Sequence, residues 1–248
     1  MPTQNLVLWL DSSIGTGTSP VTAWLDQSGE ENNATTHPET LENPPTLTLT
    51  DSDLNNLPSV SFSAFSNQAL QTGIKNFAPI STTGFDIFIV LQRGGYPNSF
   101  SMIFMHSTSR WNSGFGILRS SDGSLRGWVN DWNETSTRVD LTESDIPLET
   151  GTIIHFSYDR VNIKLETYAP SPGKFVRKTV KIAATPQAYS SPVNLYNINY
   201  ASIARGGSNL YDMTASYGEI LLYTGVLDVE NTNNVLSSLS DKYNIPLA

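Results

Sequence analysis

Short runs of alternating apolar and polar residues, bounded by Gly, Pro, Asn and Ser, recur along most of the chain. Alternation with a period of two is typical of a β-strand that buries one face. In the segment 153–159 the apolar residues share one face, and the other face carries His155, Ser157 and Asp159, which we expect to be solvated. The segment 85–91 is apolar on both faces, which predicts a central strand covered on both sides. The pattern therefore predicts a mostly β protein.

Turn residues join several of these segments into antiparallel hairpins. The sequence 121–124 (SDGS) lies between the apolar segments 115–118 and 125–129, and Asp-Gly readily adopts the positive φ of a tight reversal. A second reversal at 159–162 joins the strand before it to the alternating segment 161–168. Strands this closely spaced favour a sandwich over a parallel α/β fold.

Helical periodicity is convincing in one place, the segment 228–242 near the C-terminus. Asp228 can cap its first turn, and an apolar stripe follows at helical spacing. The stripe consists of Val235, Leu236, Leu239 and Tyr243. We expect this helix to cover the sandwich. The segment 32–56 is rich in turn residues and predicts irregular loop, and because no linker divides the sequence we expect a single domain over residues 1–248.

Charge and composition exclude several function classes. The 248 residues include 14 Lys or Arg and 23 Asp or Glu, a net charge of −9, so a phosphate-tracking surface and a nucleic-acid partner are not expected. Charged residues make up only 15%, against about 25% in an average soluble domain. Without cysteine there is no disulfide, thiolate metal site or cysteine nucleophile. The longest apolar runs are far shorter than the roughly 20 residues that span a bilayer, and residues 1–5 do not begin a secretory signal.

Two regions resemble a known family, and the first is N-terminal. The segments 6–11 (LVLWLD), 24–29 (WLDQSG) and 32–35 (NNAT) resemble the "LWLDA", "W-x-D-x-SG" and "N-x-A-T" motifs that open concanavalin A-like, LamG-like jelly-roll domains. The segment 54–62 (LNNLPSVSF) is similar to their "LNGLPAVRF", with Asn56 in place of the usual Gly.

The second region is C-terminal, where the segments 217–223 (YGEILLY) and 242–245 (KYNI) are similar to the closing strand and helix of the same domains. The two regions stand in the family's order, so the resemblance spans essentially the whole chain. It implies an all-β fold: a two-sheet antiparallel jelly-roll sandwich with one short C-terminal helix. The superfold hosts lectins, adhesion modules, viral tail and capsid proteins, hydrolases and lyases, so it does not settle the function.

Catalytic motifs are missing from the sequence. Glycosidases of this fold carry E-x-D-x-x-E on one strand, and this spacing does not occur. The acidic groups at 51–53 and 143–145 are best explained as loops and helix caps. His37, His106 and His155 have no metal-site spacing, and G-x-S-x-G is absent. The sequence therefore does not predict an enzyme. No cofactor is required, although the acidic, Asn-rich loops would allow a structural calcium ion.

One group of aromatic and polar residues has the composition of a sugar-binding site, in which an aromatic ring stacks on a pyranose and amide or charged groups bond its hydroxyls. The candidate ligand-binding residues are Trp111, Asn112, Trp128, Asn130, Asp131, Trp132, Tyr200 and Arg205. The alternative for Trp128 is packing in the core, and the alternative for the group at 199–207 is a simple turn.

These observations lead to a non-enzymatic structural or glycan-binding module displayed on a surface. We expect a virion protein (phage tail fibre, knob or capsid decoration) or an adhesin domain, located on a virion or outside the cell. Its partners would be cell-surface or virion glycans or other virion proteins, without nucleic acid or membrane insertion. Two alternatives remain open: a polysaccharide hydrolase or lyase with unrecognised residues, and a purely architectural domain that forms a homo-oligomer.

Overall fold

The computed structural model describes residues 1–36, 43–63, 66, 68–75, 82–94, 101–106, 114–129, 137–142, 149–170, 174–181, 194–198 and 214–247. Within these residues the strands form two antiparallel sheets, which we call sheet A and sheet B. The strands of sheet A are β1 (Leu6–Asp11), β4 (Thr46–Asp51), β5 (Leu57–Phe62), β7 (Phe85–Arg93), β12 (Gly151–Tyr158), β13 (Asn162–Ala169), β14 (Lys174–Lys181) and β16 (Ala215–Thr224). The strands of sheet B are β2 (Ala23–Trp24), β3 (Ala34–Thr36), β6 (Leu70–Lys75), β8 (Ser101–His106), β9 (Phe115–Arg119), β10 (Leu125–Val129), β11 (Arg138–Leu141) and β15 (Asn194–Ile198).

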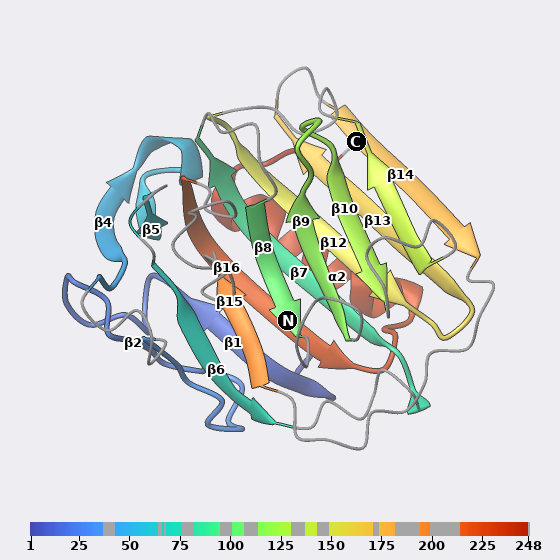
Figure 1. Ribbon diagram of the computed structural model, residues 1–248, viewed down its shortest axis with the longest axis horizontal. Coiled ribbons are helices and arrows are strands. Elements are labelled where there is room, and N and C mark those ends of the chain that lie inside the picture. Colours follow the sequence, from blue (N-terminus) through green and yellow to red (C-terminus); the bar gives the residue numbers. More distant parts are fainter. Residues whose placement is uncertain are drawn as a thin grey trace.

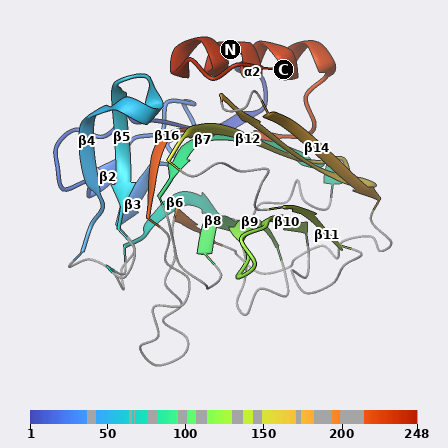
Figure 2. The same cartoon turned by 90° about the horizontal axis from the view of Figure 1, so that it is seen from above.

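The two sheets stack face to face (Figure 1). Sheet A runs in the order β14-β13-β12-β7-β16-β5-β4, with β1 also paired to β16, and sheet B runs β11-β10-β9-β8-β15-β6-β3-β2. The helix α2 (Val229–Tyr243) covers the outer face of sheet A, and both chain ends lie on this side (Figure 2). The predicted fold class, an antiparallel two-sheet sandwich with one C-terminal helix, is confirmed.

The central strand β7 shows why the core has two layers. Ile87, Ile89 and Leu91 belong to the cluster between the sheets, and Phe88 and Val90 belong to a second cluster beneath α2. Alternate side chains of a strand point to opposite faces, so a strand that is apolar throughout can bury both. The prediction of a doubly covered central strand is therefore confirmed.

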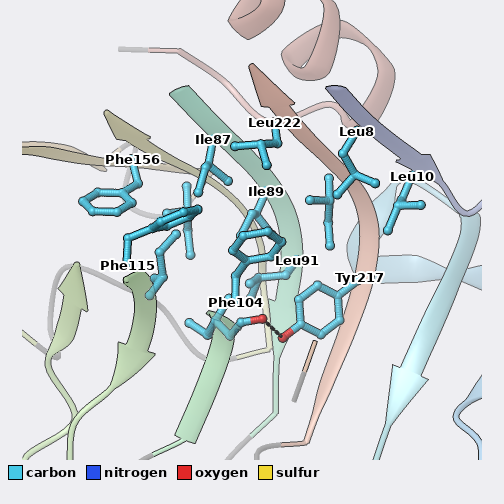
Figure 3. Packing of buried hydrophobic residues seen from close by; sticks show 14 of the residues in the cluster. Leu8, Leu10, Ile87, Ile89, Leu91, Phe104, Phe115, Phe156, Tyr217 and Leu222 are labelled. Atoms are coloured by element: carbon cyan, nitrogen blue, oxygen red, sulfur yellow. Dashed lines mark hydrogen bonds between the residues drawn. The ribbon is translucent and has the colours of Figure 1, made fainter. Parts of the chain in front are cut away.

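The larger cluster fills the space between the sheets (Figure 3). Sheet B contributes Phe104 and Phe115, which meet side chains of sheet A such as Phe156. Tyr217 is fully buried in the same layer, and its hydroxyl donates a hydrogen bond of 3.3 Å to the backbone carbonyl of Ile103 on the opposite sheet. The bond satisfies the only polar atom of this side chain, as a buried phenol requires.

Helix α2 agrees with its prediction from sequence. The Asp228 carboxylate caps the helix by accepting a 2.7 Å hydrogen bond from the Asn231 backbone N–H. The four stripe residues are buried and pack on sheet A. The helix ends at Asn244, whose φ of 52° is left-handed, a conformation that Asn tolerates better than most residues.

The hairpins β9–β10 and β12–β13 are also confirmed. Two other predictions are wrong. The segment 32–56 is not wholly irregular, because it contains β3 and β4, and β4 forms the edge of sheet A. The polar face of β12 is not solvated, because His155 is 0% and Ser157 5% exposed. Neighbouring strands and side chains cover it.

Candidate functional site

The predicted site residue Trp128 lies on the face of sheet B that points away from sheet A. Leu125 and Val129 of β10 belong to the cluster between the sheets, and a Cβ placed on Gly127 would lie 2.7 Å from Phe156 of sheet A. These three positions therefore face inward, and the alternate positions Arg126 and Trp128 face outward. Trp128 is buried, as the packing interpretation expected, but on the outer face of sheet B and not between the sheets.

The indole of Trp128 lies across its neighbour on β9. Gly116 is the register partner of Trp128, and a Cβ at Gly116 would come within 2.2 Å of the indole Cη2. Only glycine leaves room for the ring there. The indole Nε1 is buried and has no hydrogen-bond partner among the described residues. An N–H of this kind is the type of group that a ligand or a neighbouring segment can satisfy.

Beside Trp128, two arginines share one carboxylate on the same outer face. Arg126 Nε lies 2.7 Å from Asp140 Oδ1, and Arg138 Nε lies 3.1 Å from Asp140 Oδ2. The Asp140 side chain is 30% exposed, so the cluster reaches the surface. Lys178 of β14 adds a 2.9 Å hydrogen bond from its Nζ to the Asp140 backbone carbonyl. Guanidinium groups in this setting suit carboxylate, sulfate or hydroxyl oxygens.

The other predicted site residues, Trp111, Asn112, Asn130, Asp131, Trp132, Tyr200 and Arg205, lie outside the described residues and stay predictions. The sheet nevertheless fixes where the segments 111–112 and 130–132 attach. Phe115 at the start of β9 pairs with Val129 at the end of β10. The chain segments that precede β9 and follow β10 therefore join sheet B at the same end, next to Trp128. Tyr200 and Arg205 instead follow β15, which starts at that end of sheet B and runs away from it.

A second polar cluster, which sequence reasoning missed, lies on the outer face of sheet A. His155 is fully buried, with Nδ1 2.6 Å from Glu166 Oε2 and Nε2 2.8 Å from Asp86 Oδ1. Both ring nitrogens face carboxylates, so the geometry fits the doubly protonated imidazolium. The ring also stacks on Phe88, with centroids 4.3 Å apart. The hairpin turn at 159–162 signals the pairing of His155 with Glu166, but Asp86 is 69 residues away in sequence.

The electrostatics of this cluster favour its charged form. Burial alone would lower the pKa of His155, but hydrogen bonds to Asp86 and Glu166 outweigh it and raise the pKa. Burial alone would raise the pKa of Glu166, but the hydrogen bond and charge of His155, with Lys164 and Arg177, lower that pKa to about 2.

The position of the His155 cluster explains its role. Asp86 Oδ2 accepts a 2.6 Å hydrogen bond from the Leu227 backbone N–H, one residue before the cap of α2. No atom of His155 is accessible to a substrate. The group resembles acid–base machinery in composition, but its burial and its bond to the chain entering α2 mark it as a structural clamp.

Residues of the family-like motifs meet in a third cluster, under the end of α2. Lys242 Nζ lies 2.7 Å from Asp11 Oδ2 and 2.8 Å from Glu219 Oε2. Trp9 Nε1 donates to Glu219 Oε1 at 2.7 Å, and the Tyr243 hydroxyl donates to Glu219 Oε2 at 3.1 Å. Burial raises the pKa of Glu219 against the opposing effect of Lys242. The cluster joins the first strand, the last strand and the helix.

The "W-x-D-x-SG" segment is structural as well. Asp26 Oδ1 accepts from the backbone N–H groups of Trp9 at 2.8 Å and Ser28 at 2.9 Å. Asp26 Oδ2 accepts from the Asn32 backbone N–H at 2.9 Å and from the Ser28 hydroxyl at 2.7 Å. One carboxylate thus organises a turn and ties it to β1. The motifs that carry the resemblance hold the fold, and they do not point to a binding site.

A polar cleft of about 280 Å³ lies near the C-terminal end of α2. Its lining includes Ser52, Asp53, Asn55, Glu149, Tyr243 and Asn244. Burial raises the pKa of Asp53, and the charges of Asp51 and Glu149 add to the effect. Among the described residues, no group of three or more His, Asp or Glu side chains is arranged to hold a metal ion, and no helix is long and apolar enough to cross a membrane.

Comparison with known proteins shows a shared fold. No protein family matches the sequence, and no curated protein matches it. The binding domain of botulinum neurotoxin DC in complex with rat synaptotagmin II is similar with a TM-score of 0.62 at 13% identity, over 95% of this chain and 52% of that chain. The same domain in complex with SialylT gives 0.62 at 12% identity, over 96% and 52%.

Trypanosoma rangeli sialidase in complex with sialic acid is similar with a TM-score of 0.62 at 12% identity, over 97% of this chain and 33% of that chain. The present chain thus spans about half the length of the toxin domains and a third of the sialidase. At such low identity the likeness concerns the fold alone. Nearly the whole chain shares the β-sandwich architecture of these proteins.

Proposed function

We propose that this chain is a non-enzymatic glycan-binding module, a single domain of the concanavalin A-like, LamG-like type. The observation that carries the proposal is the likeness of 96–97% of the chain to β-sandwich structures described in complex with SialylT or sialic acid. A related neurotoxin structure is described in terms of cell entry through two ganglioside molecules. The family-like motifs of the first and last strands support the superfamily assignment.

The proposed site is the end of sheet B at which β9 begins and β10 ends. Trp111 precedes β9 and Trp132 follows β10, so both adjoin this end in the sequence. Aromatic rings there would stack on sugar rings, and the arginines paired with Asp140 lie on the neighbouring outer face. The setting is part of the proposal: display on a virion or a cell surface, with glycans or other virion proteins as partners.

A glycan array with the purified chain tests the proposal. We expect binding of at least one glycan class, weakened about tenfold or more by Trp111→Ala or Trp132→Ala through loss of stacking. Leu49→Ala is the matched control. Leu49 is an apolar side chain, 71% exposed, on the edge strand β4 of sheet A, and the proposed site is on the other sheet. Circular dichroism verifies the fold of each variant. A folded chain that binds no glycan overturns the proposal.

The same sample distinguishes the module from an enzyme and tests its setting. Incubation with a polysaccharide panel should release no reducing sugar, and release that depends on this chain would favour a hydrolase instead. Mass spectrometry of purified virions tests the virion setting separately. Absence from every particle preparation would remove the virion role and leave glycan binding untouched.

A further inference from the structure

The cations of this acidic chain are concentrated in one hairpin. β13, β14 and the turn between them span 20 residues and contain five of the chain's 14 Lys or Arg and one acid. The hairpin therefore has a formal charge of +4. Because the whole chain has a net charge of −9, all the other residues together carry −13. The five cations are Lys164, Lys174, Arg177, Lys178 and Lys181.

This hairpin lies where the two sheets meet along one edge of the sandwich. β14 is the last strand of sheet A and β11 is the last strand of sheet B. The bond from Lys178 to the Asp140 carbonyl joins the two strands. Arg138 of β11 adds a further cation with a side chain 21% exposed. Lys164, Arg177 and Lys181 lie on the outer face of sheet A, and Lys178 lies on the other face of β14, toward β11. Arg138 lies on the outer face of sheet B. These five cations therefore surround the edge from both sides, and we call them together the basic edge.

Acids neutralise this surface only in part. Glu166 accepts a hydrogen bond from Arg177 Nε, and its Oε2 lies 3.2 Å from Lys164 Nζ. Glu166 is buried, however, and its carboxylate also pairs with His155. Lys178 and Lys181 are exposed, and neither forms an ion pair with a described carboxylate. Asp140 in turn pairs with Arg138. Among the described residues, the five cations of the basic edge thus outnumber these two acids, in a chain that is otherwise strongly negative.

Protection of a free sheet edge is the simplest reason for lysines on an outer strand. That role is fulfilled by charges on the edge strand itself. It does not require that cations from two sheets gather at one edge.

We propose that the basic edge binds an anionic polysaccharide, one whose sugars carry carboxylate or sulfate groups. The proposal rests on the proposed function: it names the ligand class and adds a second surface to the site proposed at the end of sheet B. Arg177 and Lys181 lie on the same face of β14, four residues and therefore about 13 Å apart. Cations at this spacing fit an extended polyanion better than a single small anion.

Nucleic acid is the competing polyanion, and the rest of the chain argues against it. A duplex carries one charge per about 1.7 Å and needs a long basic track. Beyond the β13–β14 hairpin it would meet residues with a combined charge of −13. A flexible chain with more widely spaced charges can engage the edge alone.

The test measures binding of the intact chain to heparin, hyaluronate, neutral dextran and duplex DNA by isothermal titration at low and high salt. We expect binding to at least one of the two anionic polysaccharides, which salt weakens, and none to dextran. Lys178→Gln with Lys181→Gln should weaken that binding about tenfold, the loss of two charge-assisted contacts. Lys178→Arg with Lys181→Arg should retain it.

The matched control is Thr35→Glu with Thr50→Glu, which changes the net charge by the same −2 on exposed threonines of β3 and β4. Binding to heparin or hyaluronate should be nearly unchanged in this control. An equal loss in both pairs would show that only net charge matters and would overturn the basic edge as a site. Equal affinity for DNA would overturn a glycan-selective edge.

Two further outcomes separate this inference from the proposed function. Glycans bound on the array with unchanged affinity in the Lys178→Gln, Lys181→Gln variant would overturn the inference and leave the proposed function standing. Folded protein that binds no glycan on any platform would overturn both. A variant that self-associates but retains heparin or hyaluronate affinity would assign the lysines to edge protection, against the inference.

Discussion

The outer faces of the two sheets use the same ionic arrangement at different depths. On sheet A, Glu166 lies between Lys164, Arg177 and His155 and is 1% exposed. On sheet B, Asp140 lies between Arg126 and Arg138 and is 30% exposed. The buried group holds strands and α2 together, since desolvated charges must be fully paired. The exposed group is weakly stabilising and accessible to a ligand. Depth, more than residue type, separates a purely structural cluster from one that a ligand can reach.

The strongest test of this difference between the two clusters is to remove a carboxylate from the buried one. Asp86→Ala leaves the His155 imidazolium with one counter-charge and the Leu227 N–H without its acceptor. We expect a loss of about 3–5 kcal/mol in the free energy of unfolding, measured by urea denaturation. Asp86→Asn, which can still accept the Leu227 N–H, should lose less. A loss below about 1 kcal/mol for Asp86→Ala would contradict the clamp.

The second prediction concerns pH. The pKa of His155 is raised by folding, so its stabilisation is complete below its unfolded pKa of about 6.5 and is lost as pH rises through the folded value. The pKa of Glu166 is lowered to about 2, so its contribution is complete above about 4.5 and is lost as pH falls toward 2. Urea unfolding should therefore show the greatest contribution of this cluster between about pH 4.5 and 6.5.

The variant His155→Gln isolates the alkaline limb of that profile. Without the imidazole, the cluster's loss of stability above about pH 6.5 should disappear, although the variant is less stable at every pH below it. Ser157→Ala is a suitable control, because Ser157 lies on the same face of β12 and does not titrate. An alkaline limb that persists unchanged in His155→Gln would show that other groups cause it.

The third prediction tests the packing of Trp128 on sheet B. Gly116→Ala places a Cβ 2.2 Å from the indole and 2.8 Å from the Phe104 carbonyl, and should cost about 1–3 kcal/mol by overpacking. Adding Trp128→Phe removes the nearer contact, so the double variant should be less destabilised than the two single losses added together. Additive losses in thermal or urea unfolding would show that the ring does not lie over Gly116.

Sequence reasoning succeeded where the signal is local. The apolar pattern of β7, the Asp-Gly turn before β10 and the cap at Asp228 each act over a few residues, and each predicted its element correctly. β4 was missed because Pro44 and Pro45 precede it and indicate a loop, although the alternation of its Thr and Leu residues was a usable signal.

The long-range contacts were beyond sequence reasoning. The burial of His155 depends on Asp86 and on α2, which come from distant parts of the chain, and periodicity carries no information about such partners. The direction of Trp128 depends on which face of β10 meets Phe156. Leu125, Gly127 and Val129 alternate with Arg126 and Trp128, and both sets contain apolar residues. The position of the basic edge follows from the packing of β14 of sheet A beside β11 of sheet B, which no motif encodes.

The smallest expected effect on stability comes from the exposed carboxylate itself. Asp140→Asn removes the acid between Arg126 and Arg138, and urea unfolding should change by less than about 1 kcal/mol, because the site is partly solvated. Affinity for heparin or hyaluronate should rise, since the ligand no longer competes with Asp140 for the arginines. Asp241→Asn, at an exposed acid of α2, makes the same charge change away from the edge and should leave affinity nearly unaltered. If Asp140→Asn instead weakens binding, the carboxylate orients the arginines for the ligand, and its role is closer to that of Glu166 than their exposures indicate.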